Sequence, residues 1–202
     1  MIRILLVCFV LILSLEGARA QDLPALFAVS GVSALDVLPI RTHPDAASDI
    51  AGSIAPFTIG VEVVAISDDG AWGMVSTGEG NGWVAMRFLQ ATPPPKLGLI
   101  PRPLTCLGIE PFWQLRLDGI ATATYATPDA DMTMTIAEEV VTREGYFLRI
   151  SGSMGHDRTL IIRRAACSDG MSDRQFGFAL TMFSSLSGTQ RINTGCCTLD
   201  SR

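Results

Sequence analysis

The chain has 202 residues and an acidic balance, with 15 basic and 20 acidic side chains and a formal net charge of −5. Binding of a nucleic-acid backbone depends on clustered lysines and arginines, and the sequence has no such cluster. Nucleic acid is therefore not an expected partner, and the length suffices for two small domains.

The first twenty residues have the layout of a secretory signal. A charged start at Arg3 leads into an apolar run from Ile4 to Leu15, and Ala18-Arg19-Ala20 follows as a small-x-small cleavage motif. A membrane-spanning helix needs ~20 apolar residues, so this run is too short for an anchor, and no later stretch is long enough. We expect residues 1–20 to be removed and the mature chain, without a transmembrane anchor, to be periplasmic or secreted.

Residues 22–92 are expected to form a small all-β unit. Short apolar runs alternate with turn sequences such as Asp68-Asp69-Gly70. The runs are Leu35–Ile40, Ile50–Ile54, Val61–Ser67, Ala71–Ser76 and Trp83–Ala85. Runs of this length, rich in Val, Ile and Trp, are typical of a meander of strands.

Motifs in this unit follow one another in a recognisable order. They are Val37-Leu38-Pro39-Ile40-Arg41-Thr42-His43-Pro44, then Gly52-Ser53-Ile54 with Gly60-Val61-Glu62-Val63, then Ala71-Trp72-Gly73-Met74-Val75 and Gly82-Trp83-Val84-Ala85. Across roughly residues 35–90 this order resembles bacterial SH3 domains, with Pro39 where that family has Asn. The resemblance implies an SH3-like barrel that contacts cell-wall peptide or a protein partner.

The two tryptophans of this unit allow two interpretations. Trp72 and Trp83 could form a platform, because aromatic faces stack on sugars and peptides. In a barrel this small, two such residues more often close the core.

Residues 93–103 are predicted to be a linker, because five of the eleven prolines lie there. Proline fixes φ and removes an amide donor, so the segment should be an extended, semi-rigid spacer between two units.

The four cysteines after the leader lie in residues 104–202, and an even number in an exported chain indicates two disulfides. Neighbouring Cys196 and Cys197 could bond to each other only in a strained ring. Cys106 and Cys167 should each reach one of them, with the pairing open. No C-x-x-C spacing suggests zinc, and Asp129-Ala130-Asp131 lacks the further donors of a calcium loop.

Residues 104–202 are predicted to form an antiparallel barrel of seven or eight strands. Apolar residues alternate at period two, as in Phe176, Phe178, Leu180 and Met182, so each set should face one side of a strand. The stretch 136–143 could pass for two helical turns, but its Val140-Val141-Thr142 favours a strand.

Two long motifs carry a second resemblance. They are Cys106-Leu107-Gly108-Ile109-Glu110-Pro111-Phe112-Trp113 and Cys167-Ser168-Asp169-Gly170-Met171-Ser172-Asp173, followed by Gly195-Cys196 near the end. They resemble a family of bacterial envelope proteins marked by these motifs, for which no activity is established. A looser likeness to calycin-type barrels implies a tryptophan near the first strand packed against a late arginine.

The disulfides should gather both motifs at one rim of the barrel. Glu110, Asp169, Asp173 and Arg174 would then be neighbours, either as a polar pocket with Trp113 as its floor or as a structural rim. In the rim, Asp169 would form an Asx turn and Arg174 would neutralise Glu110 or Asp173.

No catalytic residue or cofactor is expected. The only histidines are His43 and His156, no nucleophile motif is present, and the cysteines are committed to disulfides. Carboxylates such as Glu110 and Asp173 could act on a glycan only if they faced each other across a cleft. We expect a non-enzymatic envelope binding protein; the alternatives are a calycin-like small-molecule carrier and an inhibitor or accessory of a wall hydrolase.

Overall fold

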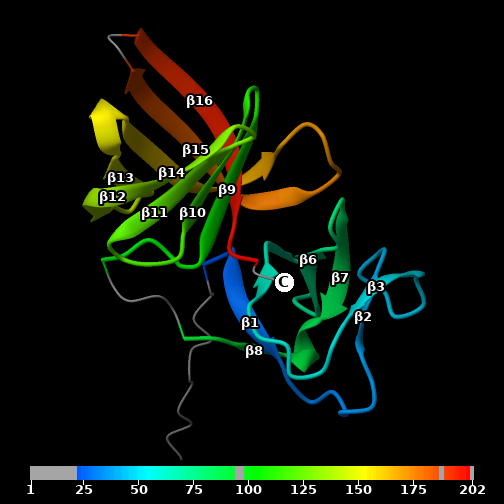
Figure 1. Cartoon of the computed structure of the whole chain (residues 1–202). Helices are drawn as coiled ribbons and strands as arrows, with labels where there is room; N and C mark the ends of the chain where they lie inside the picture. Colours follow the sequence, from blue (N-terminus) through cyan, green and yellow to red (C-terminus); the bar gives the residue numbers. More distant parts are fainter. Residues whose placement is uncertain (1–21, 94–97, 187–188, 201–202) are drawn as a thin grey trace, which may run out of the picture.

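The computed structural model describes residues 22–93, 98–186 and 189–200. Within them the chain is almost entirely β-structure, arranged as an N-terminal β unit and a closed barrel (Figure 1). The predicted signal segment 1–20 lies outside the described residues. Among the residues that are described, no helix has the length and apolar character needed to cross a bilayer.

The N-terminal unit contains two sheets. One has the order β4-β1-β8, from Val61–Val63, Ala25–Val29 and Leu89–Ala91. The other has the order β3-β2-β7-β6-β5, from Ile50–Ile54, Leu38–Arg41, Asn81–Ala85, Trp72–Ser76 and Ala65–Ile66. Between them lies a core that includes Phe27, Leu38, Val61 and Val84.

The sequence analysis missed β1, the central strand of the smaller sheet. Its residues Ala25, Phe27 and Val29 face the core of their own unit, while Leu26 on the opposite face packs against the barrel core. Because β1 contacts apolar surroundings on both faces, it lacks the polar alternation that marks a half-exposed strand.

The barrel closes with the order β10-β11-β12-β13-β14-β15-β16-β9. Its strands, in chain order, are β9 Leu104–Ile109, β10 Phe112–Leu117, β11 Thr122–Thr127, β12 Ala130–Val141, β13 Tyr146–Ser151, β14 Asp157–Ser168, β15 Gln175–Leu186 and β16 Thr189–Thr198. The all-β class, the count of eight strands and the strand at 136–141 are thereby confirmed. An eight-stranded barrel is narrow enough for side chains to fill it, and Leu115, Leu148, Leu160 and Phe178 do so here.

Two disulfides join the barrel strands. Cys106 of β9 bonds to Cys197 of β16, which it faces directly across the sheet, and Cys167 of β14 bonds to Cys196. The prediction that each partner reaches one of the adjacent pair is confirmed, and both Cys106 and Cys167 lie within strands. Two disulfides indicate an oxidising, extracytoplasmic location.

The predicted linker is not a spacer over its whole length. Its residues 94–97 lie outside the described part, but Ile100 is buried in the barrel core and Arg102 forms an ion pair with Glu139 at 2.8 Å. The end of this proline-rich segment is thus packed as part of the barrel.

Candidate functional site

A cleft of about 590 Å³ lies where the barrel meets the N-terminal unit. Its walls come from the ends of β9, β10 and β11, from the β14–β15 loop, and from the β6–β7 hairpin of the N-terminal unit, which lies below that loop in Figure 1. The lining is mainly apolar and includes Leu107, Ile109, Phe112, Trp113, Met171 and Phe176.

Two of these apolar side chains are largely exposed. Phe112, at the start of β10, is 55% exposed, and Met171, in the β14–β15 loop, is 64% exposed. Other apolar side chains are equally exposed, Phe57 and Ile59 among them, but Phe112 and Met171 differ in lining the same cleft. Methionine is also flexible enough to adapt to ligands of different shape.

Trp113 is the fixed part of the cleft wall. It is 4% exposed, and its ring stacks on Tyr125 with centroids 6.2 Å apart and an angle of 17° between the planes. Gly108 and Gly195 lie against the indole, since a Cβ on either would come within 3 Å of it. The indole of Trp113 is thus fixed in position by Gly108, Gly195 and Tyr125.

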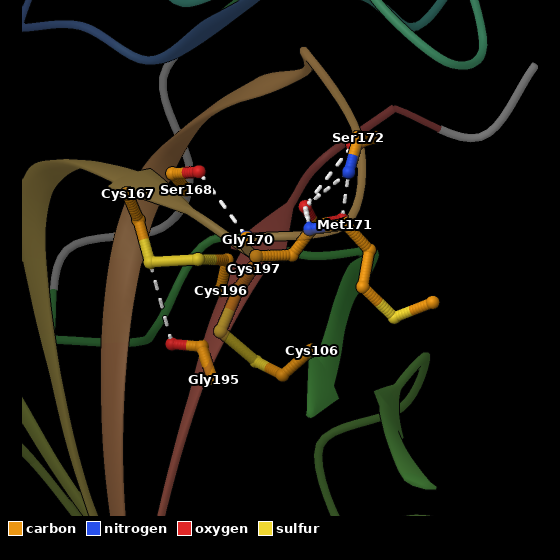
Figure 2. The surroundings of a disulfide bond; sticks show 10 residues. Cys106, Cys167, Ser168, Gly170, Met171, Ser172, Gly195, Cys196 and Cys197 are labelled. Atoms are coloured by element: carbon orange, nitrogen blue, oxygen red, sulfur yellow. Dashed lines mark hydrogen bonds between the residues drawn. A yellow bond between two sulfur atoms is a disulfide. The ribbon is translucent and has the colours of Figure 1, made fainter. Parts of the chain in front are cut away.

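The β14–β15 loop is shaped by an Asx turn at Asp169. Oδ1 of Asp169 accepts hydrogen bonds from the amides of Met171 at 3.0 Å and Ser172 at 2.9 Å, and the Ser172 hydroxyl also donates to this carboxylate (Figure 2). Burial raises the pKa of Asp169, but these hydrogen bonds outweigh it, so the pKa lies below its ordinary value. The predicted turn is present, and the Asp169 charge is taken up within it.

Arg174 does not neutralise Glu110 or Asp173, so this prediction is wrong. Its Nη2 donates to Oγ1 of Thr198 at 2.9 Å, and its guanidinium lies 4.5 Å from the centre of the Phe176 ring. The Thr198 hydroxyl in turn donates to Oε2 of Glu62 in β4. Arg174 therefore belongs to a contact between the two units, while one side of it lines the cleft.

Glu62 was not among the predicted site residues. It is only 2% exposed, and its Oε1 accepts a hydrogen bond from the Leu199 amide at 2.9 Å. Burial raises the pKa of Glu62, with the hydrogen bonds from Thr198 and Leu199 acting in the opposite direction. In the sequence Glu62 occupies a position that points away from its own core, and only the docked barrel buries it.

Asp173 holds the hairpin against the barrel. Its amide donates to the carbonyl of Glu79 at 2.9 Å, and its carbonyl accepts from Nδ2 of Asn81 at 3.0 Å. Asp173 thus acts through its backbone and is not part of the cleft lining. Glu110 lines a neighbouring hollow with Pro111 and Asp129 rather than the cleft itself. Of the predicted cluster, the cleft brings together Trp113, Asp169 and Arg174.

The two tryptophans of the N-terminal unit do not close its core. Trp72 and Trp83 are half-buried and lie on the face of β6 and β7 opposite to the buried Val75 and Val84. The core interpretation is therefore wrong, and the residues remain candidates for a platform.

Comparison with protein-family models, with curated proteins and with solved structures finds no match. The resemblances to bacterial SH3 domains and to the envelope family stay predictions. Within the described part of the chain, no group of three or more His, Cys, Asp or Glu side chains is placed to hold a metal ion.

Proposed function

We propose that this chain is a non-enzymatic binding protein of the bacterial envelope, periplasmic or secreted, that holds a small apolar molecule in the cleft between its two units. The observation that carries the proposal is the exposure of Phe112 and Met171 beside the buried Trp113. The volume of about 590 Å³ lies within the range of small-molecule sites, roughly 300–1,000 Å³.

The binding site differs from that of a barrel that carries its ligand inside. The interior is filled by side chains such as Leu148, Ile150 and Phe178, each of which is fully buried. The apolar ligand is instead expected against the barrel wall, where the β14–β15 loop and the β6–β7 hairpin cover it. Arg174 and Glu79 at the edge of the cleft would contact any polar end of the ligand.

The test measures binding of 1-anilinonaphthalene-8-sulfonate, a fluorescent probe with apolar aromatic rings and one sulfonate group, and its displacement by fatty acids and isoprenoid alcohols. Phe112→Ser and Met171→Ser are expected to weaken probe binding by roughly tenfold, since each removes about 1.5 kcal/mol of apolar contact with the probe. Ile120→Ser is the matched control, because Ile120 is a 70% exposed apolar residue of the barrel outside the cleft. Probe binding that is equal in all three variants would refute the proposal.

A second candidate function rests on Trp72 and Trp83. Their half-buried rings on the outer face of β6 and β7 support contact with cell-wall peptide or an envelope protein, including a wall hydrolase that the chain would inhibit or assist. Retention of the chain on immobilised muropeptides, and its loss in Trp83→Ala, would favour this candidate. Retention without any effect of Trp83→Ala would count against it.

A further inference from the structure

Four large apolar side chains are exposed together at one end of the N-terminal unit. They are Leu35 (99% exposed) and Val37 (46%) in the β1–β2 loop, and Phe57 (68%) and Ile59 (75%) in the β3–β4 loop. The β1–β2 loop lies at the end of this unit that is farthest from the barrel (Figure 1). We name these four side chains the apolar tip.

Backbone contacts hold the two loops side by side. The β1–β2 loop begins after Val29, whose amide donates to the Thr58 carbonyl at 2.8 Å, and it ends at Leu38, which is directly opposite Ile54 in the sheet. Both ends of the first loop are therefore next to the second loop, which follows Ile54. The four side chains thus lie at the same end of the unit although they come from two loops.

Phe57 stands at a turn position that normally has glycine. The Thr58 amide donates to the Ala55 carbonyl at 3.4 Å, so residues 55–58 form a tight turn with Phe57 at its third position. The φ of Phe57 is +61°, in the left-handed region where a side chain larger than glycine strains the backbone. Packing does not explain this strain, because the ring is largely in water. Strained residues concentrate at functional sites, so we expect the exposed ring itself to have a role.

The charges near the apolar tip leave one arginine without a counter-charge. Asp36 is the only charged residue of the two loops, and its Oδ1 accepts a hydrogen bond from the Val37 amide at 2.8 Å. The guanidinium of Arg87 lies 4.7 Å from the centre of the Phe88 ring, and the Phe88 carbonyl accepts from the Ser30 amide at 2.8 Å, so Arg87 is beside the β1–β2 loop. Arg87 is exposed and forms no ion pair with any described residue. An exposed cation beside exposed apolar side chains is complementary to a phospholipid surface, which presents phosphate groups above hydrocarbon.

The apolar tip is too small to account for a stable protein interface. Each side of such an interface contributes ~20–30 residues, whereas the tip offers four large apolar side chains on two loops. Side chains that project from loops can enter a lipid surface singly, without a partner of matching shape, and each gains free energy by leaving water. A bilayer therefore fits the tip better than a second protein surface does.

We propose that the apolar tip and Arg87 bind the surface of a phospholipid bilayer, with the apolar side chains inserted among the lipids and Arg87 against phosphate groups. This contact goes beyond the proposed function and is separate from the cleft. Strands β2 and β7 are antiparallel with Arg41 opposite Trp83, so the β6–β7 hairpin that covers the cleft lies at the other end of the sheet from the tip. A chain bound to a bilayer in this way holds its cleft away from the lipid.

The test is flotation of the exported chain with vesicles of phosphatidylcholine, and with vesicles of phosphatidylcholine and phosphatidylglycerol in equal parts. We expect the chain to float with both, because insertion of the apolar tip does not depend on lipid charge. Leu35→Ser should weaken binding to both by roughly tenfold or more, the effect of withdrawing one large apolar side chain from lipid. Arg87→Gln should weaken binding to the phosphatidylglycerol vesicles by about fivefold, the contribution of one arginine at an anionic lipid surface.

Phe57→Gly separates lipid binding from folding. Glycine adopts a positive φ without strain, so this variant should keep the thermal stability of the parent chain while binding vesicles roughly tenfold more weakly. Ile192→Ser is the matched control, because Ile192 is a 65% exposed apolar residue of β16 in the barrel, and it should leave vesicle binding unchanged.

Failure of the parent chain to float with either kind of vesicle would overturn the proposal, and so would equal weakening of binding in Ile192→Ser. Sedimentation of the same samples without vesicles tests for a second copy as the partner. A parent chain that does not float but forms a dimer, which Phe57→Gly dissociates, would assign the apolar tip to self-association and overturn the proposal as well.

Discussion

Two glycines decide where the indole of Trp113 can lie. A Cβ on Gly108 would be 2.2 Å from Nε1 of Trp113, and a Cβ on Gly195 would be 2.2 Å from the carbonyl of Leu107. Neither distance is compatible with the present packing, and the ring cannot retreat because Tyr125 stacks on it.

We expect Gly108→Ala to lower the free energy of unfolding by about 1–3 kcal/mol, the usual cost of overpacking a core. Gly119→Ala is the control, since the nearest atom to its added Cβ is 4.0 Å away, and it should change stability by less than about 0.5 kcal/mol. Urea unfolding followed by tryptophan fluorescence measures both. Equal stability of the two variants would contradict the assigned role of Gly108.

Glu62 gives the contact between the units a dependence on pH. Because the pKa of Glu62 is raised in the folded chain above the unfolded value of 4.5, the folded state holds its proton more tightly than the unfolded state does. The free energy of unfolding should therefore fall as pH rises from 4.5 through the raised pKa, by at most about 1.4 kcal/mol per pH unit.

Glu62→Gln removes this titration, so the slope should be absent from the variant over the same pH range. The test measures the free energy of unfolding of the parent chain and of the variant across that pH range. The difference between the two should change with pH. A difference that does not change with pH would show that Glu62 keeps the same pKa in both states.

The two disulfides, which join strands β9, β14 and β16, are expected to contribute different amounts to the free energy of unfolding. The Cys106–Cys197 bond closes a separation of 91 residues and the Cys167–Cys196 bond one of 29. In the chain-entropy account, longer loops gain more stability, so replacing the first pair by alanine should cost roughly 4–5 kcal/mol and the second pair roughly 3–4 kcal/mol. Thermal and urea unfolding of the two paired variants measure this order, and the reverse order would refute the entropic account here.

Strands in which apolar residues alternate at period two were predictable from the sequence, and strands without this alternation were not. Phe176, Phe178 and Leu180 repeat at period two because their neighbours in β15 lie outside the apolar barrel core. Strand β9 lacks this signal because its inward positions are Leu104, Cys106 and Gly108. Gly108 has no side chain, and the indole of Trp113 on the neighbouring strand β10 fills the space beside it. The apolar volume at this position of β9 therefore comes from another strand.

The candidate site was predictable only in part, because some of its contacts join residues that are far apart in the sequence. Trp113 and Asp169 belong to the two long motifs and Arg174 directly follows the second, and the disulfides bring these segments together. Arg174 is connected to Glu62 of the other unit through the Thr198 hydroxyl, and no local pattern in the sequence relates residues so far apart.

The whole molecule is two β units joined by buried polar contacts. Glu62 of β4 accepts hydrogen bonds from Thr198, the last residue of β16, and from Leu199 after it, and Arg164 of β14 donates to the carbonyl of Pro24 at 2.7 Å. Buried hydrogen bonds of this kind fix one relative orientation, because any shift leaves charged groups without partners. The cleft has a defined shape as a consequence.

Replacing Asn81 tests whether the position of the β6–β7 hairpin affects ligand binding, independently of the residues that line the cleft. It does not line the cleft, but its Nδ2 holds the Asp173 carbonyl at 3.0 Å and so keeps the β6–β7 hairpin against the barrel. We expect Asn81→Ala to raise the hydrogen-exchange rate of the Asp173 amide, which donates to Glu79, and to weaken binding of 1-anilinonaphthalene-8-sulfonate by about fivefold, the size of one lost hydrogen bond. Gln90→Ala, at an exposed position of β8, should change neither quantity. If exchange rises in Asn81→Ala while probe affinity stays the same, the hairpin does not shape the binding site, and the barrel wall with Phe112 and Met171 alone must hold the ligand.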